Sequence, residues 1–269
     1  MSFVRLTGTI ALALSTLPAT AQAPTDAVLI DGFEALRAMR IDSLELRDPH
    51  LFRSVPILGC IDATPLLNNE LDAQFSSDGD GDGLLDRSPM QLFRGIRIDG
   101  VGQMRAVDGA CTAPASTTAC TAAPNAVSAI TGYAGQSVGI CLDAWPGTTR
   151  PYSPALQPAT GPCVASASFD QSIDLGGGLV LPLLDTALGA TIRVNPTPGL
   201  VNGVMRGFVS EAVAEAITLP GDFGGGTLAS VLPGGSGSCA AGDDRDELDG
   251  VSGWWFYFQY TATDVAYAE

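Results

Sequence analysis

A segment of nine residues, 78–86, alternates aspartate with glycine and ends in two leucines and a further aspartate, DGDGDGLLD. Carboxylates at the first, third, fifth and ninth positions of so tight a loop converge on one hard cation, and the seventh residue offers its backbone carbonyl. Gly83, at position six, permits the sharp turn, and Leu85 can point into the core and pin the loop to the domain. The predicted calcium ligands are Asp78, Asp80, Asp82, the carbonyl of Leu84, and Asp86.

This spacing resembles the calcium loops of EF-hands, dockerins and thrombospondin type 3 repeats, over about a dozen residues. It departs from them at position twelve, where Pro89 replaces the usual bidentate acid. Another carboxylate or a water molecule must replace that ligand, so we expect calcium affinity in the roughly 10⁻⁴–10⁻³ M range of extracellular modules. The alternative is an acidic, solvated turn. Four crowded carboxylates repel one another without a cation, which favours the metal site.

A second acidic segment, 243–249 (DDRDELD), runs from Asp243 to Asp249 just before an aromatic stretch. It could supply the missing calcium ligand or form a second site. Its spacing fits no loop template, and Arg245 can pair with its neighbours. A solvated loop is therefore the favoured interpretation, since runs of charge usually face water.

The segment 135–139, GQSVG, matches the G-x-S-x-G pattern of serine hydrolases. That pattern requires a preceding strand, a following helix and a downstream histidine. The single histidine, His50, precedes Ser137 and could serve only in another chain order. A structural role for His50, within the DPH segment 48–50, is favoured. Paired carboxylates for glycoside hydrolysis stay open, because a sequence gives no distances.

Six cysteines, an even number, indicate three disulfides in an exported protein. Cys111 and Cys120 bracket a loop-like segment, and so do Cys141 and Cys163, whose spacer contains five prolines. We therefore pair 111–120 and 141–163, which leaves Cys60 with Cys239. Neither C-x-x-C nor histidine spacing occurs, so the sequence favours neither a zinc site nor redox catalysis.

The first 21 residues have the pattern of a Sec-type bacterial signal peptide: Arg5, an apolar stretch, and an A-x-A site ending at Ala21. Cleavage at Ala23 would place Pro24 after the cut and is less favoured. No other segment is long and apolar enough to predict a membrane span. We expect a secreted or periplasmic protein. The net charge of −16, with 13 basic residues, all arginine, argues against nucleic-acid partners.

Over most of the chain the sequence predicts short strands, which are separated by turns rich in glycine and proline; the chain has 32 glycines and 18 prolines. We expect one antiparallel, jelly-roll-like β-sandwich domain over 22–269, with long disulfide-linked loops and one or two short helices. Ser210 should cap a short helix, and Asp99-Gly100 should turn a hairpin. The predicted strands are 43–52, 90–98, 101–107, 163–174, 178–193, 199–209 and 254–261, with a short helix within 24–42.

The stretch WWFYFQYT, 254–261, could present aromatic rings to a sugar, but alternation turns half of it inward, so core packing explains it better. As a whole, the chain resembles secreted bacterial proteins that combine DPH, DGDGDGLLD, GLVNG, RGFVSEA and GWWFY segments. The resemblance implies kinship and carries no activity. We expect a non-enzymatic calcium-binding protein with a structural or surface-interaction role toward an extracellular ligand or surface component. The alternatives are a carbohydrate-binding module and a secreted hydrolase.

Overall fold

The structure is a computed structural model that describes residues 36–175, 178–223 and 225–269. The predicted signal peptide, 1–21, lies outside the described residues. So does most of the helix predicted within 24–42, and the described end of that segment is strand instead. None of the described helices is long and apolar enough to cross a membrane.

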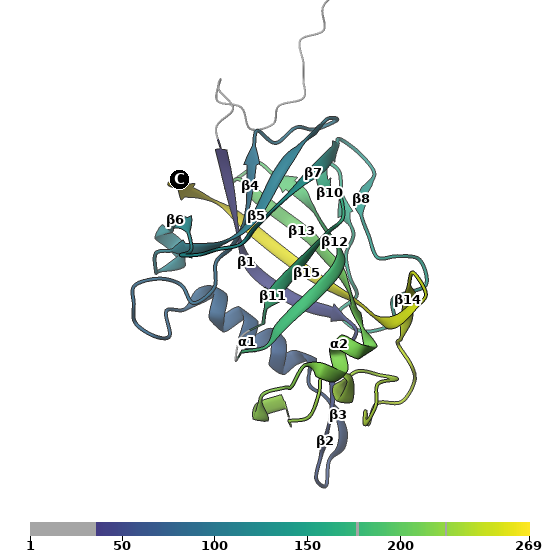
Figure 1. Ribbon diagram of the computed structural model, residues 1–269. Helices are drawn as coiled ribbons and strands as arrows, with labels where there is room; N and C mark the ends of the chain where they lie inside the picture. Colours follow the sequence, from purple (N-terminus) through teal and green to yellow (C-terminus); the bar gives the residue numbers. More distant parts are fainter. Residues whose placement is uncertain (1–35, 176–177, 224) are drawn as a thin grey trace, which may run out of the picture.

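Eight antiparallel strands form the body of the molecule (Figure 1). Each pairs with the next of the eight along the chain, and the last pairs with the first, so the sheet closes into a barrel. The strands are β1 (Leu36–Asp48), β4 (Pro89–Arg94), β5 (Val101–Cys111), β7 (Ser128–Gln136), β10 (Cys163–Ser166), β12 (Val180–Arg193), β13 (Gly199–Ser210) and β15 (Val251–Tyr267).

The chain is mainly β, as predicted, but the expected jelly-roll-like sandwich is replaced by this barrel. A sandwich keeps two sheets with free edges, whereas here β1 pairs with β15 over nine residue pairs, from Ala38 with Val265 to Asp48 with Tyr257. This pairing joins segments more than 200 residues apart in sequence. A local pattern of apolar residues therefore cannot predict the pairing of β1 with β15.

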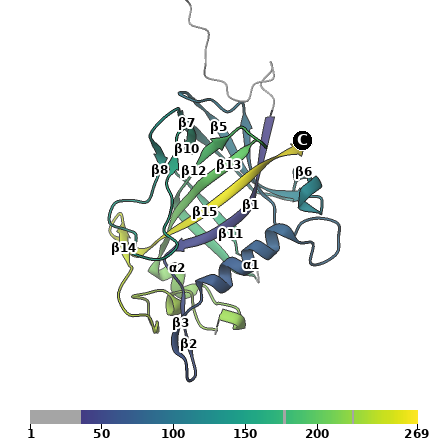
Figure 2. The ribbon, with the colours of Figure 1, turned by 180° about the vertical axis from the view of Figure 1, so that it is seen from behind.

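Smaller elements decorate the barrel. Helix α1 (Thr64–Ser76) closes one end with Leu67, Leu71 and Phe75, which join the barrel core (Figures 1 and 2). The others are β2 (Phe52–Val55), β3 (Gly59–Asp62), the 3-10 helices η1 (Ala115–Thr117), η2 (Gly221–Phe223) and η3 (Ala229–Val231), β6 (Ala119–Ala122), β8 (Ile140–Leu142), β9 (Ala159–Thr160), β11 (Phe169–Asp174), α2 (Glu211–Ala216) and β14 (Asp246–Leu248).

Strand β15 is buried on both of its faces. Trp254, Phe256, Phe258 and Tyr260 belong to the interior core, while Trp255 and Tyr257 pack with Phe208 in a separate outer cluster. The loop over residues 143–158 covers this outer cluster: Tyr257 Oη accepts a hydrogen bond from the Trp145 amide at 3.1 Å. The strand therefore offers no exposed row of rings for a sugar to stack on.

The three disulfides join Cys60 to Cys239, Cys111 to Cys120 and Cys141 to Cys163, the pairs that the sequence spacing favours. Ser210 caps α2, because its side chain accepts a hydrogen bond from the Val213 amide. β4 and β5 pair as predicted, but six residues, 95–100, connect them rather than a two-residue turn. The predicted strand 163–174 is two strands, β10 and β11, and sequence reasoning missed α1 and β7.

Candidate functional site

The 78–86 loop follows directly from the end of α1 and leads into β4. Backbone hydrogen bonds fix both of its sides: the Asp86 amide donates to Ser77 O at 3.0 Å, and the Arg87 amide donates to Gln74 O at 3.1 Å. Farther along, Leu84 forms an isolated antiparallel bridge with Thr112. The loop is thus held between a helix end and the loop closed by the Cys111–Cys120 disulfide.

Three of the predicted ligands come together. Oxygen atoms of Asp78, Asp80 and Asp86 all lie within 4.8 Å of one another. Two ligands that each lie about 2.3–2.6 Å from one calcium ion are at most about 5 Å apart, so this spacing fits a calcium ion. The loop backbone orients Asp78, whose carboxylate accepts hydrogen bonds from the Gly81, Asp82 and Gly83 amides at 2.7, 3.1 and 2.9 Å.

The other two predicted ligands are placed differently. Asp82 is not part of the close group of oxygens, and its carboxylate accepts a hydrogen bond from the Leu84 amide at 2.8 Å. The bridge to residue 112 uses Gly83 O and the Leu85 amide. Because backbone groups alternate in direction along an extended chain, the Leu84 carbonyl is not used in this bridge and points away from residue 112.

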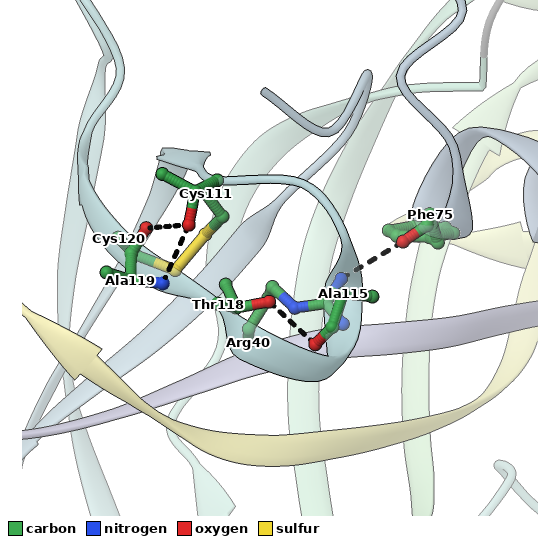
Figure 3. The surroundings of a disulfide bond; sticks show 8 residues. Arg40, Phe75, Cys111, Ala115, Thr118, Ala119 and Cys120 are labelled. Carbon is green, nitrogen blue, oxygen red and sulfur yellow. Dashed lines mark hydrogen bonds between the residues drawn. A yellow bond between two sulfur atoms is a disulfide. The ribbon is translucent and has the colours of Figure 1, made fainter. Parts of the chain in front are cut away.

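A small apolar cluster on the outer face of the barrel anchors the loop. Leu85 is 5% exposed and packs with Met90, Leu92 and the buried Cys111–Cys120 disulfide. Beside it, Arg40 of β1 is buried and donates to Phe75 O at the end of α1, at 3.1 Å (Figure 3). A cation at the C-terminal end of a helix is favourable. The loop is thereby tied to the barrel on both sides.

The segment 243–249 does not complete this site. It precedes β15, on the far side of the barrel from the 78–86 loop in Figure 1. Its residue Asp244 instead joins a buried polar cluster with Asp48 and Arg150. Arg245 pairs with Asp243 at 2.7 Å and with Glu211 at 3.1 Å, so the predicted internal pairing of Arg245 is present.

The buried polar cluster gathers three acids around one arginine. The Arg150 amide donates to Asp48 at 2.7 Å, and its guanidinium lies 3.3 Å from Asp244 and 3.7 Å from Asp246. Burial raises the pKa of Asp48 to about 7, although its bond from Arg150 opposes the change. Burial also raises the pKa of Tyr152, whose hydroxyl donates to Asp244. Asp48 and Asp244 were singled out from the sequence, but no spacing signal pointed to Arg150 or Tyr152.

His50 borders the same cluster. Its Nδ1 lies 2.6 Å from Asp62, and its ring stacks on Tyr152 with centroids 4.0 Å apart. Ser137 is elsewhere, after β7, where its amide donates to Asp99 at 2.8 Å. Among the described residues, no hydrogen bond joins His50 to a serine, threonine or cysteine. No helix follows Ser137, because the next element is strand β8.

Comparison with protein-family models, with curated proteins and with solved structures finds no match for this chain.

Proposed function

We propose that this chain is an exported, non-enzymatic calcium-binding protein in which the ion has a structural role. The observation that carries the proposal is the group of Asp78, Asp80 and Asp86 oxygens within 4.8 Å, on a loop held by its own backbone bonds. The Leu84 carbonyl, which is free of the bridge to residue 112, is the proposed fourth protein ligand. Water supplies the remaining ligands, since Pro89 begins β4 in place of the usual acid.

The position of the loop suits an ion that stabilises the fold. The loop connects the end of α1, the Cys111–Cys120 loop and the start of β4. Its exposed carboxylates repel one another unless a cation is bound. An ion at this point therefore favours the folded arrangement of all three elements, and it stabilises the native state by mass action.

Thermal unfolding with millimolar calcium and with a chelator tests the proposal. At a calcium concentration one hundred times the dissociation constant, linkage gives about 2.7 kcal/mol of added stability. Asp80→Ala should remove most of that gain, because Asp80 is exposed and belongs to the close oxygen group. Asp82→Ala should remove less, because Asp82 lies outside that group.

Asp72→Ala is the matched control. Asp72 is an exposed acid on the neighbouring helix α1, outside the loop, so this variant should keep the full calcium response. Calorimetric titration of calcium into the same four proteins gives the affinities directly. A wild-type midpoint that ignores calcium would refute the proposal and leave the segment as an acidic turn.

The export part of the proposal rests on three disulfides, which form in oxidising compartments, and on the signal-peptide pattern of residues 1–21. We expect the mature chain to begin at Gln22. Intact-mass measurement of the protein recovered outside the cytoplasm checks this. A cytoplasmic product that retains residues 1–21 contradicts it.

The two alternatives receive less support. A sugar-binding face on β15 needs exposed rings, and the 143–158 loop covers the outer ones. A serine hydrolase needs His50 beside a nucleophile, but Ser137 lies elsewhere, after β7, where its backbone amide donates to Asp99. The interaction role, toward an extracellular ligand or surface component, stays part of the proposal.

A further inference from the structure

The barrel wall is split along one seam. Strand β7 pairs with β10 only over Tyr133–Gln136, whereas Ser128–Gly132 pairs with β5 alone among the described strands. After β10 the chain diverges from β7 and continues as β11, which pairs with β12. A cavity of about 710 Å³ lies between β11 and the segment 123–129, which includes the start of β7.

The cavity reaches from this seam toward the barrel interior, and its deep wall is apolar. Buried side chains from four elements form it: Ile41, Phe75, Leu188 and Met205. The seam itself contributes Ala129 from β7 and Ile173 from β11. An apolar cavity of this size suits a drug-sized organic molecule, since such sites typically measure about 300–1,000 Å³.

One polar group in the wall lacks a partner. Gln91 lies on β4, is 2% exposed and lines the cavity. Its side chain lies close to the buried Tyr260 hydroxyl, but neither its Nε2 nor that hydroxyl makes a hydrogen bond of normal geometry. A buried donor without an acceptor costs about 1–3 kcal/mol, so an acceptor supplied by a ligand is favoured there. The terminal torsion of glutamine is broad, and a rotation about it presents the amide to the cavity.

Charged groups are confined to the rim. Arg87 and Asp174 pair at 2.5 Å, and Asp108 lies near them, with its pKa raised by burial and lowered by Arg87. Asp170 also lines the cavity, so the rim carries three acids and one arginine, and that arginine is paired. A neutral ligand suits this entrance better than an anionic one.

We infer that this cavity is a binding site for a neutral, largely apolar small molecule that carries one hydrogen-bond acceptor, such as a carbonyl, directed at Gln91. The inference is independent of the calcium proposal, because none of the Asp78, Asp80 and Asp86 side chains lines the cavity.

Fluorescence titration of the intact protein with N-phenyl-1-naphthylamine, a neutral apolar probe, tests the site. Wild type should enhance and blue-shift the probe's emission. Ala129→Trp fills the seam and should weaken probe binding at least tenfold. Ala134→Trp is the matched control: it lies on the same strand, exposed on the outer face, and should leave binding unchanged. Ser172→Trp, on the exposed opposite rim, repeats the block should Ala129→Trp fail to fold.

Displacement of the probe by fluorene and by 9-fluorenone, which differ by one carbonyl, tests Gln91. Gln91→Leu should weaken fluorenone binding about fivefold, the value of one neutral hydrogen bond, and leave fluorene unchanged. Equal effects on both compounds refute the acceptor assignment. Equal probe binding by wild type and by both seam variants, or no binding by wild type, refutes the site. Repeating the titration with chelator separates this result from any failure of the calcium loop.

Discussion

Among the described carboxylates, Asp48 has the most strongly raised pKa. It is 4% exposed at the end of β1, and burial raises its pKa to about 7, against bonding from Arg150. In the unfolded chain an aspartate titrates near pH 3.9. Between about pH 4 and 7 the folded protein therefore holds a proton that the unfolded chain has released, so the free energy of unfolding falls as the pH rises through this window.

Asp48→Asn should remove that dependence. The amide oxygen still accepts the hydrogen bond from Arg150, while the ionisable proton is gone. Relative to wild type, the variant should gain stability progressively from pH 4 to pH 7, by at most about 4 kcal/mol, and show no gain below pH 4. Urea denaturation of both proteins at pH 4, 5.5 and 7 measures the difference. A constant difference across the three pH values contradicts the raised pKa.

At the scale of elements, the 143–158 loop is a cover for the outer face of β15. Trp145 stacks under Arg206 at 3.9 Å and contacts Trp255, with ring centroids 6.2 Å apart. Gln157 and Gln259 exchange two hydrogen bonds, at 2.8 and 3.2 Å. The Cys141–Cys163 disulfide closes this loop, so the covering of the aromatic cluster depends on it.

Replacing both Cys141 and Cys163 with alanine should cost about 2–4 kcal/mol of stability and loosen the cover. Trp255 then meets water, so we expect its emission to shift to longer wavelengths before global unfolding in a denaturant titration. Far-ultraviolet circular dichroism should stay unchanged, because the barrel hydrogen bonds remain. A coincident loss of both signals would show that loop and barrel unfold together.

Local chemistry made some elements predictable. Ser210 before a run of alanine, valine and glutamate gave a capped helix, and the DGDGDGLLD spacing gave a loop with Leu85 buried. Helix α1 was missed although Leu67, Leu71 and Phe75 recur at helical spacing. Its start is weakly marked, because Ala63 offers no side-chain cap and no acid lies in the first turn. The polar cluster of Asp48, Arg150 and Asp244 also escaped, since its members are about 100 residues apart and meet only through the closed barrel.

At the scale of the whole molecule, the Cys60–Cys239 disulfide ties the β2–β3 hairpin to the segment before β14, across 179 residues. Cys60 is exposed and Cys239 half-buried, so replacing both with alanine removes little packing. The cost then comes mainly from the longer reach of the unfolded chain, about 2–5 kcal/mol. Guanidinium denaturation should show this loss with an unchanged native near-ultraviolet spectrum. A loss below about 1 kcal/mol would mean that the unfolded chain keeps these segments together.

The pairing of Ala38 with Val265 means that the order of the strands in the sequence can be permuted. The two ends of the described barrel lie side by side, so a short linker from Glu269 to residue 36 can join them into a circular chain. New termini can then be placed at an exposed turn, where a break in the backbone disturbs the fold least. The tip of the β2–β3 hairpin qualifies, because Ile57 and Leu58 are fully or largely exposed. We expect a circular permutant that starts at Leu58 to fold into the same barrel. The order of the strands in space then does not depend on their order in the gene.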